Sequence, residues 1–99
     1  LRAHLQTLID YVVTHLQCKY WHLLPSKTCI QPLVVGNNQD VLALSEYLQT
    51  QGILVPAIRP PTVPVNTGRL RISLSAAHTM EDVITLVNAI KKAEKVLTI

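Results

Sequence analysis

The feature that most constrains the fold is the strict alternation of apolar and polar residues from Arg69 to Ser75. Leu70, Ile72 and Leu74 occupy every second position, with arginine or serine between them. Successive side chains of a β-strand point to opposite faces, so this period of two predicts a strand with one buried face. The other face carries two arginines and is too polar to form a second core. We therefore expect helices to cover one face of the sheet.

Apolar periodicity predicts the remaining elements. Apolar residues recur every three or four positions over residues 1–23, 39–51 and 80–96, which predicts three helices. Short apolar runs over 30–36 and 53–58 predict two more strands. We expect an α+β fold, a two-layer α/β arrangement in the order α-β-α-β-β-α. Its sheet should be small, three-stranded and mixed, mostly antiparallel, with the helices packed on one face. The helix between the first two strands favours a common direction for that pair.

Residues with special backbone preferences mark the ends of these elements. Asn38 is a suitable N-cap for the second helix, and Gly52 is placed to end it in the left-handed conformation. Pro56 interrupts the second predicted strand, which should therefore lie at an edge of the sheet. Thr79 and Asp82 have the spacing of a capping box, which marks the start of the last helix.

Composition limits the classes of function. The chain has 99 residues, enough for one domain, and 48% are apolar, with no Phe and one Trp, so the core is aliphatic. The net charge of +3 and the few aromatic residues argue against a nucleic-acid binder. No apolar stretch is long enough to span a membrane, and no secretion signal is visible. We therefore expect a cytoplasmic protein in which Cys18 and Cys29 are free thiols.

A proline-rich loop contains the strongest candidate site. Arg59 precedes Pro60 and Pro61, and each proline restricts both itself and the residue before it. A stiff loop can hold one guanidinium toward a carboxylate or phosphate. Together with Arg69 and Arg71, Arg59 could form an anion site. The alternative is that all three arginines belong to a solvated surface.

Histidines and a cysteine form two weaker candidates. His4, His15, Cys18 and His22 would share one side of a helix over residues 1–23 and could hold a metal, although a partly exposed flank explains them better. We expect no metal site, because none of the usual ligand spacings is present. His78, just before the last helix, is better explained by a local hydrogen bond than by catalysis.

Motifs for catalysis are missing from the sequence. It contains no nucleophile elbow, no phosphate-binding glycine loop and no paired carboxylates. Lys19 and Lys27 lie in no context typical of Schiff-base chemistry. From the residues alone, the chain is better suited to binding a molecule than to transforming it.

Four segments resemble the C-terminal small domain of the α-oxoamine synthases, pyridoxal-phosphate enzymes of the aspartate-aminotransferase fold type. They are Gln31–Gly36 (QPLVVG), Ala57–Pro64 (AIRPPTVP), Arg69–Arg71 (RLR) and Ala76–Thr79 (AAHT). The Ile-Arg-Pro-Pro part is most similar to the biotin-pathway branch of that family. That branch condenses L-alanine with a pimeloyl thioester, with loss of carbon dioxide, to give 8-amino-7-oxononanoate.

The resemblance implies roles for two residues and for parts outside this sequence. Arg59 would pair with the carboxylate of the amino-acid substrate, and Thr62 would lie near the active site. Pyridoxal 5'-phosphate would be bound by a lysine of the large domain, so no catalytic or cofactor-binding residue is expected in this chain, which would be inactive alone. The resemblance implies that the partners are this large domain, L-alanine, the pimeloyl thioester and, in the intact enzyme, a second subunit of a homodimer.

The domain organisation follows the same reasoning. We expect residues 1–99 to form a single domain, with a leading helix and connector over 1–29 and an α/β core over 30–99. The chain begins at Leu1 and enters a helical pattern at once, so we expect it to be part of a longer protein. One departure from the family is Val65–Gly68, where a small residue, Gly, Thr and Ala are common. Asn66, in the position of that Gly, tolerates a positive φ, and Gly68 could adopt one as well.

Two alternatives to the alanine-specific enzyme remain open. One is a sister α-oxoamine synthase that uses glycine or serine. The other is a stand-alone module whose arginines bind a small carboxylate or mediate an interaction.

Overall fold

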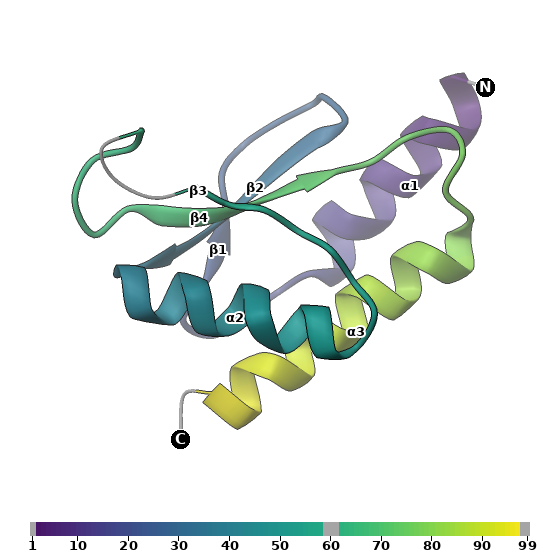
Figure 1. Cartoon of the computed structure of the whole chain (residues 1–99). Coiled ribbons are helices and arrows are strands. Elements are labelled where there is room, and N and C mark those ends of the chain that lie inside the picture. The colour runs from purple at the N-terminus through teal and green to yellow at the C-terminus, as the bar shows by residue number, and fades with distance from the viewer. Residues whose placement is uncertain (1, 59–61, 98–99) are drawn as a thin grey trace.

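The structure is a computed structural model that describes residues 2–58 and 62–97. Within these residues the chain forms three helices and four strands. Their order is α1 (Arg2–His15), β1 (His22–Leu23), β2 (Ile30–Gly36), α2 (Asn38–Thr50), β3 (Ala57–Ile58), β4 (Gly68–Ser73) and α3 (Met80–Leu97). The helices lie on one side of a single sheet, as Figure 1 shows. The predicted α+β class and the placement of the helices are confirmed.

The sheet has four strands in the order β1-β2-β4-β3, and every neighbouring pair is antiparallel. The prediction of a three-stranded mixed sheet was therefore wrong in detail. β2 and β3 do run in the same direction, as the helix between them predicts, but β4 lies between them and pairs with both. β3 is an edge strand, as Pro56 predicts, and is shorter than the run over 53–58. Proline cannot donate to a ladder, and the Pro56 carbonyl accepts a hydrogen bond from Arg71 N at 3.0 Å.

The central strand β4 has the two faces that its sequence predicts. Leu70 and Ile72 are buried beneath the helices, whereas Arg71 and Ser73 on the opposite face are exposed. The register with β2 shifts near Gly36, which has a φ of +129°. Such an irregularity increases the local twist of a strand pair, and glycine adopts this φ without strain.

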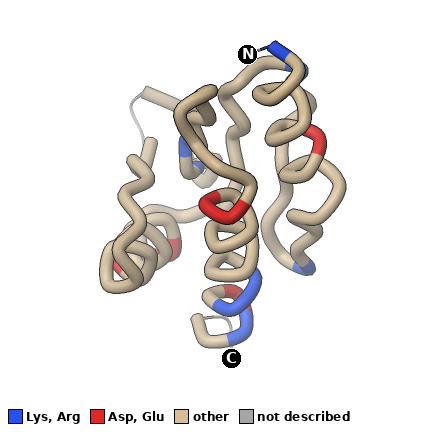
Figure 2. The backbone as a smooth tube through the Cα atoms, turned by 90° about the vertical axis from the view of Figure 1, so that its right-hand side faces the viewer, with Lys and Arg blue, Asp and Glu red and all other residues tan. Residues whose placement is uncertain are grey.

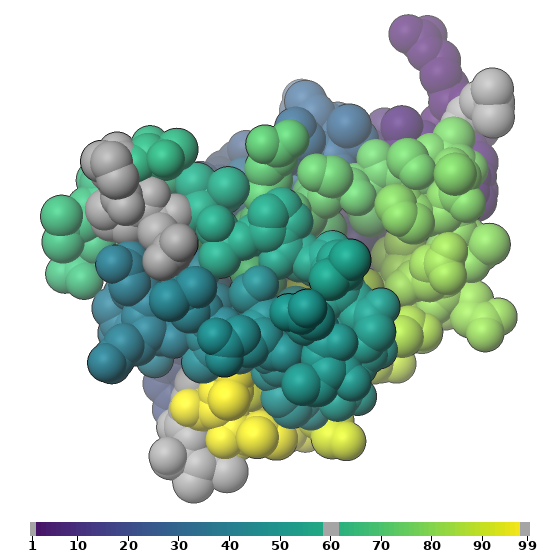
Figure 3. All heavy atoms as spheres, in the orientation of Figure 1, coloured from purple at the N-terminus to yellow at the C-terminus, as the bar shows by residue number. Residues whose placement is uncertain are grey.

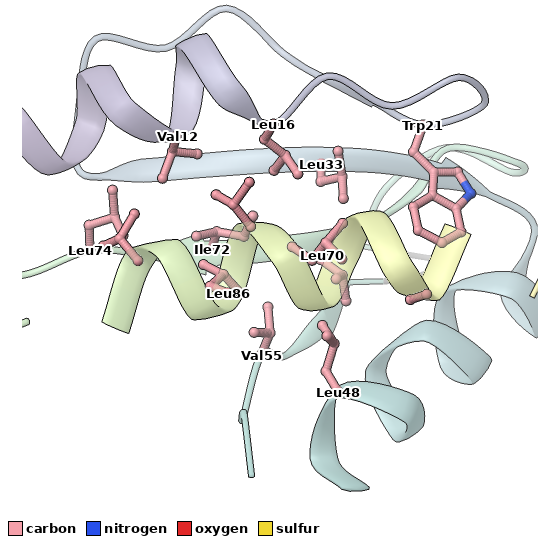
Figure 4. Close-up of a cluster of buried hydrophobic side chains, with 14 of the residues drawn as sticks. Val12, Leu16, Trp21, Leu33, Leu48, Val55, Leu70, Ile72, Leu74 and Leu86 are labelled. Carbon is pink, nitrogen blue, oxygen red and sulfur yellow. The ribbon is translucent and has the colours of Figure 1, made fainter. Parts of the chain in front are cut away.

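One hydrophobic cluster joins the inner face of the sheet to all three helices. Figure 4 shows α1, α3 and the strands converging on this cluster. Its buried members are Leu8, Ile9, Val12, Leu16, Trp21, Leu33, Leu44, Leu48, Val55, Leu70, Ile72, Leu74, Val83, Leu86, Val87, Ile90 and Ala93. Burial of apolar area is the main favourable term in folding, so α1 is part of the same core as the α/β region. Among the described residues, no helix combines the length and apolar character needed to cross a membrane.

The first helix is shorter than its apolar periodicity predicts, because α1 ends at His15 and not near residue 23. The Glu94 carboxylate of α3 accepts hydrogen bonds from the backbone N–H groups of Lys19 (2.8 Å), Tyr20 (2.7 Å) and Trp21 (3.3 Å). These N–H groups are then not available to bond within a helix. The chain turns, Trp21 enters the core, and β1 pairs with β2.

The predicted boundaries of the second and third helices are confirmed, apart from a one-residue shift at α2. Its N-cap is Asn37, not Asn38, and Asn37 Oδ1 accepts from Asp40 N at 2.9 Å. Gly52 follows α2 with a φ of +80°, the left-handed conformation that was expected. At α3 the capping box forms in both directions, from Thr79 N to Asp82 Oδ2 at 2.8 Å and from Asp82 N to Thr79 Oγ1 at 3.1 Å.

The capping box at α3 makes the stability of the chain depend on pH. The hydrogen bonds from Thr79, first its backbone N–H and then its hydroxyl, hold the pKa of Asp82 below its usual range. A carboxyl whose pKa is lower in the folded state stabilises the fold above its unfolded pKa, and this contribution is lost as the pH falls below about 4. Urea unfolding of Asp82→Ala should therefore show a stability deficit at pH 7 that shrinks toward pH 3. The control is Glu81→Ala in the same exposed helical turn, and equal deficits of Asp82→Ala at both pH values would contradict the interpretation.

The close approach of β4 to α2 depends on the absence of a side chain at Gly68. A Cβ at this position would lie 2.7 Å from Val41 Cγ2 and 3.0 Å from the Gly36 carbonyl oxygen. Val41 is fully buried and β-branched, so it has little freedom to move aside.

We expect Gly68→Ala to lower the free energy of unfolding by about 1–3 kcal/mol through overpacking. Adding Val41→Ala should restore part of this loss, so the two changes together should cost less than their sum. The measurement is a double-mutant cycle by chemical denaturation. Gly52→Ala is the matched control, because no atom lies within 4 Å of a Cβ there and Val41→Ala should not rescue it. Strict additivity at Gly68 and Val41 would rule out the contact.

Candidate functional site

The candidate site lies in the connection between β3 and β4. Arg59, the residue predicted to bind a carboxylate, falls in residues 59–61, which are outside the described part of the chain. The structure does describe both flanks of this segment. Ile58 pairs with Arg69 of β4, and Thr62, the second predicted site residue, is exposed. The connection between β3 and β4 therefore leaves and rejoins the sheet near the start of β4, beside the edge strand β3.

A compact turn forms the second half of this connection. Thr67 donates to the Pro64 carbonyl from its backbone N–H at 3.1 Å and from its hydroxyl at 2.5 Å. Asn66 lies between them with a φ of +62°, so it supplies the positive φ expected where the family has glycine. Gly68 does not take a positive φ, and its role is the close approach to α2. The turn fixes where the loop meets β4.

Arg69 and Arg71 lie two positions apart on the outer face of β4. Arg69 is half-buried, and its Nε donates to the Thr67 carbonyl at 3.1 Å, so this guanidinium braces the turn. Arg71 is exposed and lies opposite Pro32 of β2. Because Arg69 is engaged with its own loop, the described geometry favours a structural role for it over a shared anion site with Arg71.

A surface hollow of about 480 Å³ lies beside the other end of β4. Residues 51–56, the end of β4 and the first turns of α3 line it. Its charged or titratable lining residues are Arg71, His78, Glu81 and Asp82. Figure 3 shows the segments around residues 51–56 and the start of α3 side by side on this face. Sequence reasoning missed this hollow, because three segments distant in sequence build it and only Arg71 and His78 stood out.

His78 makes local hydrogen bonds, as expected. Its Nδ1 accepts from Ser75 N at 3.0 Å, and its carbonyl oxygen accepts from His4 Nε2 at 2.7 Å. The ring therefore orders the turn before α3, and the carbonyl ties that turn to α1. This is a structural use of the side chain.

The four residues considered for a metal do not share a helix face, because α1 ends at His15. His15 stacks on the Tyr11 ring at 4.0 Å between centroids, and His22 belongs to β1. Among the described residues, no three His, Cys, Asp or Glu side chains are grouped so that they could hold a metal ion. Cys18 is a free thiol, and burial, followed by the nearby Glu94 carboxylate, raises its pKa to about 11.

The lysines do not fit a covalent site for pyridoxal phosphate. All five are described and all are exposed: Lys19, Lys27, Lys91, Lys92 and Lys95. Three of them gather near the C-terminal end of α3, which Figure 2 shows in blue. A Schiff-base lysine needs a desolvated pocket or a neighbouring cation to lower its pKa, and exposed positions supply neither reliably. No step of cofactor chemistry is therefore assigned to residues of this chain.

Comparison with known proteins identifies close relatives in sequence. The 8-amino-7-oxononanoate synthase of Methylobacillus flagellatus is 50% identical over 94 residues, which are 95% of this chain and 24% of that protein. The enzyme of the same name from Polaromonas naphthalenivorans is 59% identical over 75 residues, which are 76% of this chain and 18% of that protein. The chain thus spans about a quarter or less of the length of these curated relatives.

Solved structures share the fold. A serine palmitoyltransferase from S. paucimobilis superimposes with a TM-score of 0.87 at 21% identity, over 98% of this chain and 25% of that one. The 8-amino-7-oxononanoate synthase from Francisella tularensis gives a TM-score of 0.73 at 25% identity, over 99% of this chain and 28% of that one. The family model for aminotransferase class I and II matches residues 1–90. The chain therefore belongs to the aminotransferase class I and II family.

Proposed function

We propose that this chain is the C-terminal small domain of an acyltransferase of the 8-amino-7-oxononanoate synthase type. The intact enzyme would use pyridoxal 5'-phosphate to condense L-alanine with a pimeloyl thioester in biotin biosynthesis, with loss of carbon dioxide. The observation that carries the proposal is the 50% identity to a named 8-amino-7-oxononanoate synthase across 95% of this chain. The match of residues 1–90 to the aminotransferase class I and II family supports the same cofactor.

Residues 1–99 would form one domain whose partner is a large domain of the same protein. The shared core supports this, since Leu8 and Val12 of α1 are buried in the same cluster as Leu70 of β4. The five exposed lysines support placing the cofactor lysine in the large domain. The isolated chain would then be inactive. A homodimer of the intact enzyme and a cytoplasmic location are parts of the same proposal.

Arg59 would orient the substrate carboxylate. The anchors on either side of its loop support this role. Ile58 is paired in the sheet before the loop, and the Pro64–Thr67 turn closes it. With both ends held and two prolines following Arg59, the loop backbone would lose little conformational entropy when the guanidinium binds. A carboxylate held in two hydrogen bonds is oriented for reaction at the neighbouring carbon. Thr62, exposed at the end of this segment, would face the same ligand.

Substitution of Arg59 tests this role in the intact enzyme. Arg59→Ala should weaken alanine binding by about 30-fold or more, because truncating one partner of such a charge pair costs about 2–5 kcal/mol. Cofactor binding should be unchanged. The measurement is a titration of the cofactor absorption band with L-alanine. Arg71→Ala is the matched control, since this exposed arginine should leave the titration unaltered.

Substrate preference distinguishes the proposal from its alternatives. The same titration with L-alanine, glycine and L-serine should saturate at the lowest concentration with alanine. Preference for glycine or serine would assign the chain to a sister enzyme. Absence of any cofactor band in the intact protein would overturn the enzyme proposal in favour of a carboxylate-binding module. Unchanged alanine affinity in Arg59→Ala would overturn the residue assignment alone.

A further inference from the structure

The hollow beside β4 opens where the neighbouring segment stops pairing with this strand. The Arg71 N–H still donates to the Pro56 carbonyl at 3.0 Å, but Pro56 has no N–H with which to continue the ladder. Two positions further along, the same register would pair Ser73 with Leu54. No hydrogen bond joins Ser73 to Leu54 in the part of the chain that the structure describes. The two segments separate here, and both line the hollow of about 480 Å³.

Ser73 is left with an unpaired backbone N–H and carbonyl at this edge of the sheet. Alternate residues of an antiparallel strand direct both backbone groups to the same neighbour. Arg71 and Ser73 therefore face the β3 side, whereas the Leu74 N–H donates to the Cys29 carbonyl on the β2 side at 2.8 Å. Ser73 is exposed, and within residues 2–58 and 62–97 neither of its backbone groups has a partner. An open edge of this kind is a template for an added strand.

One wall of the hollow suits an apolar side chain on such a strand. Side chains alternate across a strand, so the two neighbours of a residue paired with Ser73 would point toward the helices. On that side Val55 and Leu86 line the hollow, and each is 8% exposed. Leu54 at the rim is 82% exposed, which is unusual for a side chain of this size. An apolar residue entering here would remove part of this apolar surface from water.

The charges around the hollow favour a basic side chain as the other neighbour. Glu81 of α3 lines the hollow and forms no hydrogen bond or ion pair within the described residues. Asp82 adds a second carboxylate, although it also accepts the capping-box bond from Thr79 N. Arg71 lies on the outer face of β4 and is paired with neither of them. His78 Nδ1 accepts a backbone N–H, which only a ring nitrogen without a proton can do.

We infer that the hollow beside β4 receives an extended peptide segment of a partner protein, in which one residue pairs with Ser73 and its two neighbours, one basic and one apolar, point into the hollow. The pairing is antiparallel, because that arrangement lets both backbone groups of Ser73 bond to a single residue. The basic neighbour comes first in the peptide, since this direction places it opposite Leu74, next to the turn that leads to α3 and Glu81. The apolar neighbour follows and contacts Val55 and Leu86.

The size of the hollow fits this occupant, since ligand pockets span about 300–1,000 Å³. The short opening admits one paired residue and not a long strand, because Pro56 blocks one side and the Ser75 N–H is already bonded to His78 Nδ1 on the other. No residue of the β3–β4 connection takes part. The peptide site and the enzyme proposed above can therefore fail separately.

The first test is the affinity of the intact protein for acetyl-Lys-Thr-Leu-amide, measured by isothermal titration calorimetry. We expect saturable binding with a dissociation constant below about 1 mM. The matched control is the same peptide methylated on the threonine nitrogen, which removes the N–H that would donate to the Ser73 carbonyl. It should bind at least about ten-fold more weakly, because that hydrogen bond is lost.

The second test changes the protein. Ser73→Pro removes the unpaired N–H and should weaken binding at least about ten-fold, whereas Ser73→Ala keeps both backbone groups and should bind as the parent does. Glu81→Lys, at an exposed site where folding is not at stake, should weaken binding of the lysine peptide. The same variant should bind acetyl-Glu-Thr-Leu-amide more tightly than the parent does, because the charges are exchanged.

Three results would overturn the inference: no saturable binding, equal affinity for the methylated and unmethylated peptides, or unchanged binding of the lysine peptide by Glu81→Lys. Self-association of the protein that competes with the peptide, seen by sedimentation, would assign this edge to a second copy of the chain and overturn it as well.

Discussion

The Glu94 carboxylate holds the chain segment after α1, and the arrangement of the first third of the protein depends on this contact. Three consecutive backbone N–H groups, from Lys19 to Trp21, donate to it. Charge-assisted bonds of this kind are stronger than neutral ones, and here one side chain satisfies three backbone donors at once. As a result the Trp21 ring enters the core and β1 joins the sheet. The same carboxylate helps to keep the Cys18 thiol protonated.

Local pattern was enough to predict the elements whose ends are set by neighbouring residues. The alternation in β4, the capping box of α3 and the left-handed Gly52 all appear as expected, because the interactions responsible span a few positions. The end of α1 could not be predicted this way. Its apolar spacing continues past His15, but the competing partner, Glu94, lies more than seventy residues away in sequence. Strand β1 was also missed, because two residues are too few to show the alternation of a strand.

The candidate site was also predictable only in part. The sequence and its family resemblance single out Arg59 and Thr62, and the structure adds the anchors that hold their loop at each end. The spacing in sequence left open whether Arg69 shares an anion site with Arg59 or belongs to a surface face of the strand. In the structure, Arg69 Nε donates to the Thr67 carbonyl, so Arg69 contacts the turn. The departure from the family at Val65–Gly68 also has a physical explanation. Asn66 keeps the positive φ, and Gly68 leaves space for the Val41 side chain of α2. This contact between two segments distant in sequence is visible only in three dimensions.

The short strands at both edges of the sheet affect how the protein behaves among its own copies. Edge strands with unpaired backbone groups are templates for pairing with another chain. Here β1 and β3 are two residues each, and Pro56 beside β3 has no N–H to offer. Where β2 extends beyond β1, hydroxyls occupy its edge: Ser26 donates to the Ile30 carbonyl at 2.7 Å, and Ile30 N donates to Thr28 Oγ1 at 3.2 Å. Strand-to-strand aggregation is thereby discouraged, because neither edge offers a long run of free backbone donors and acceptors.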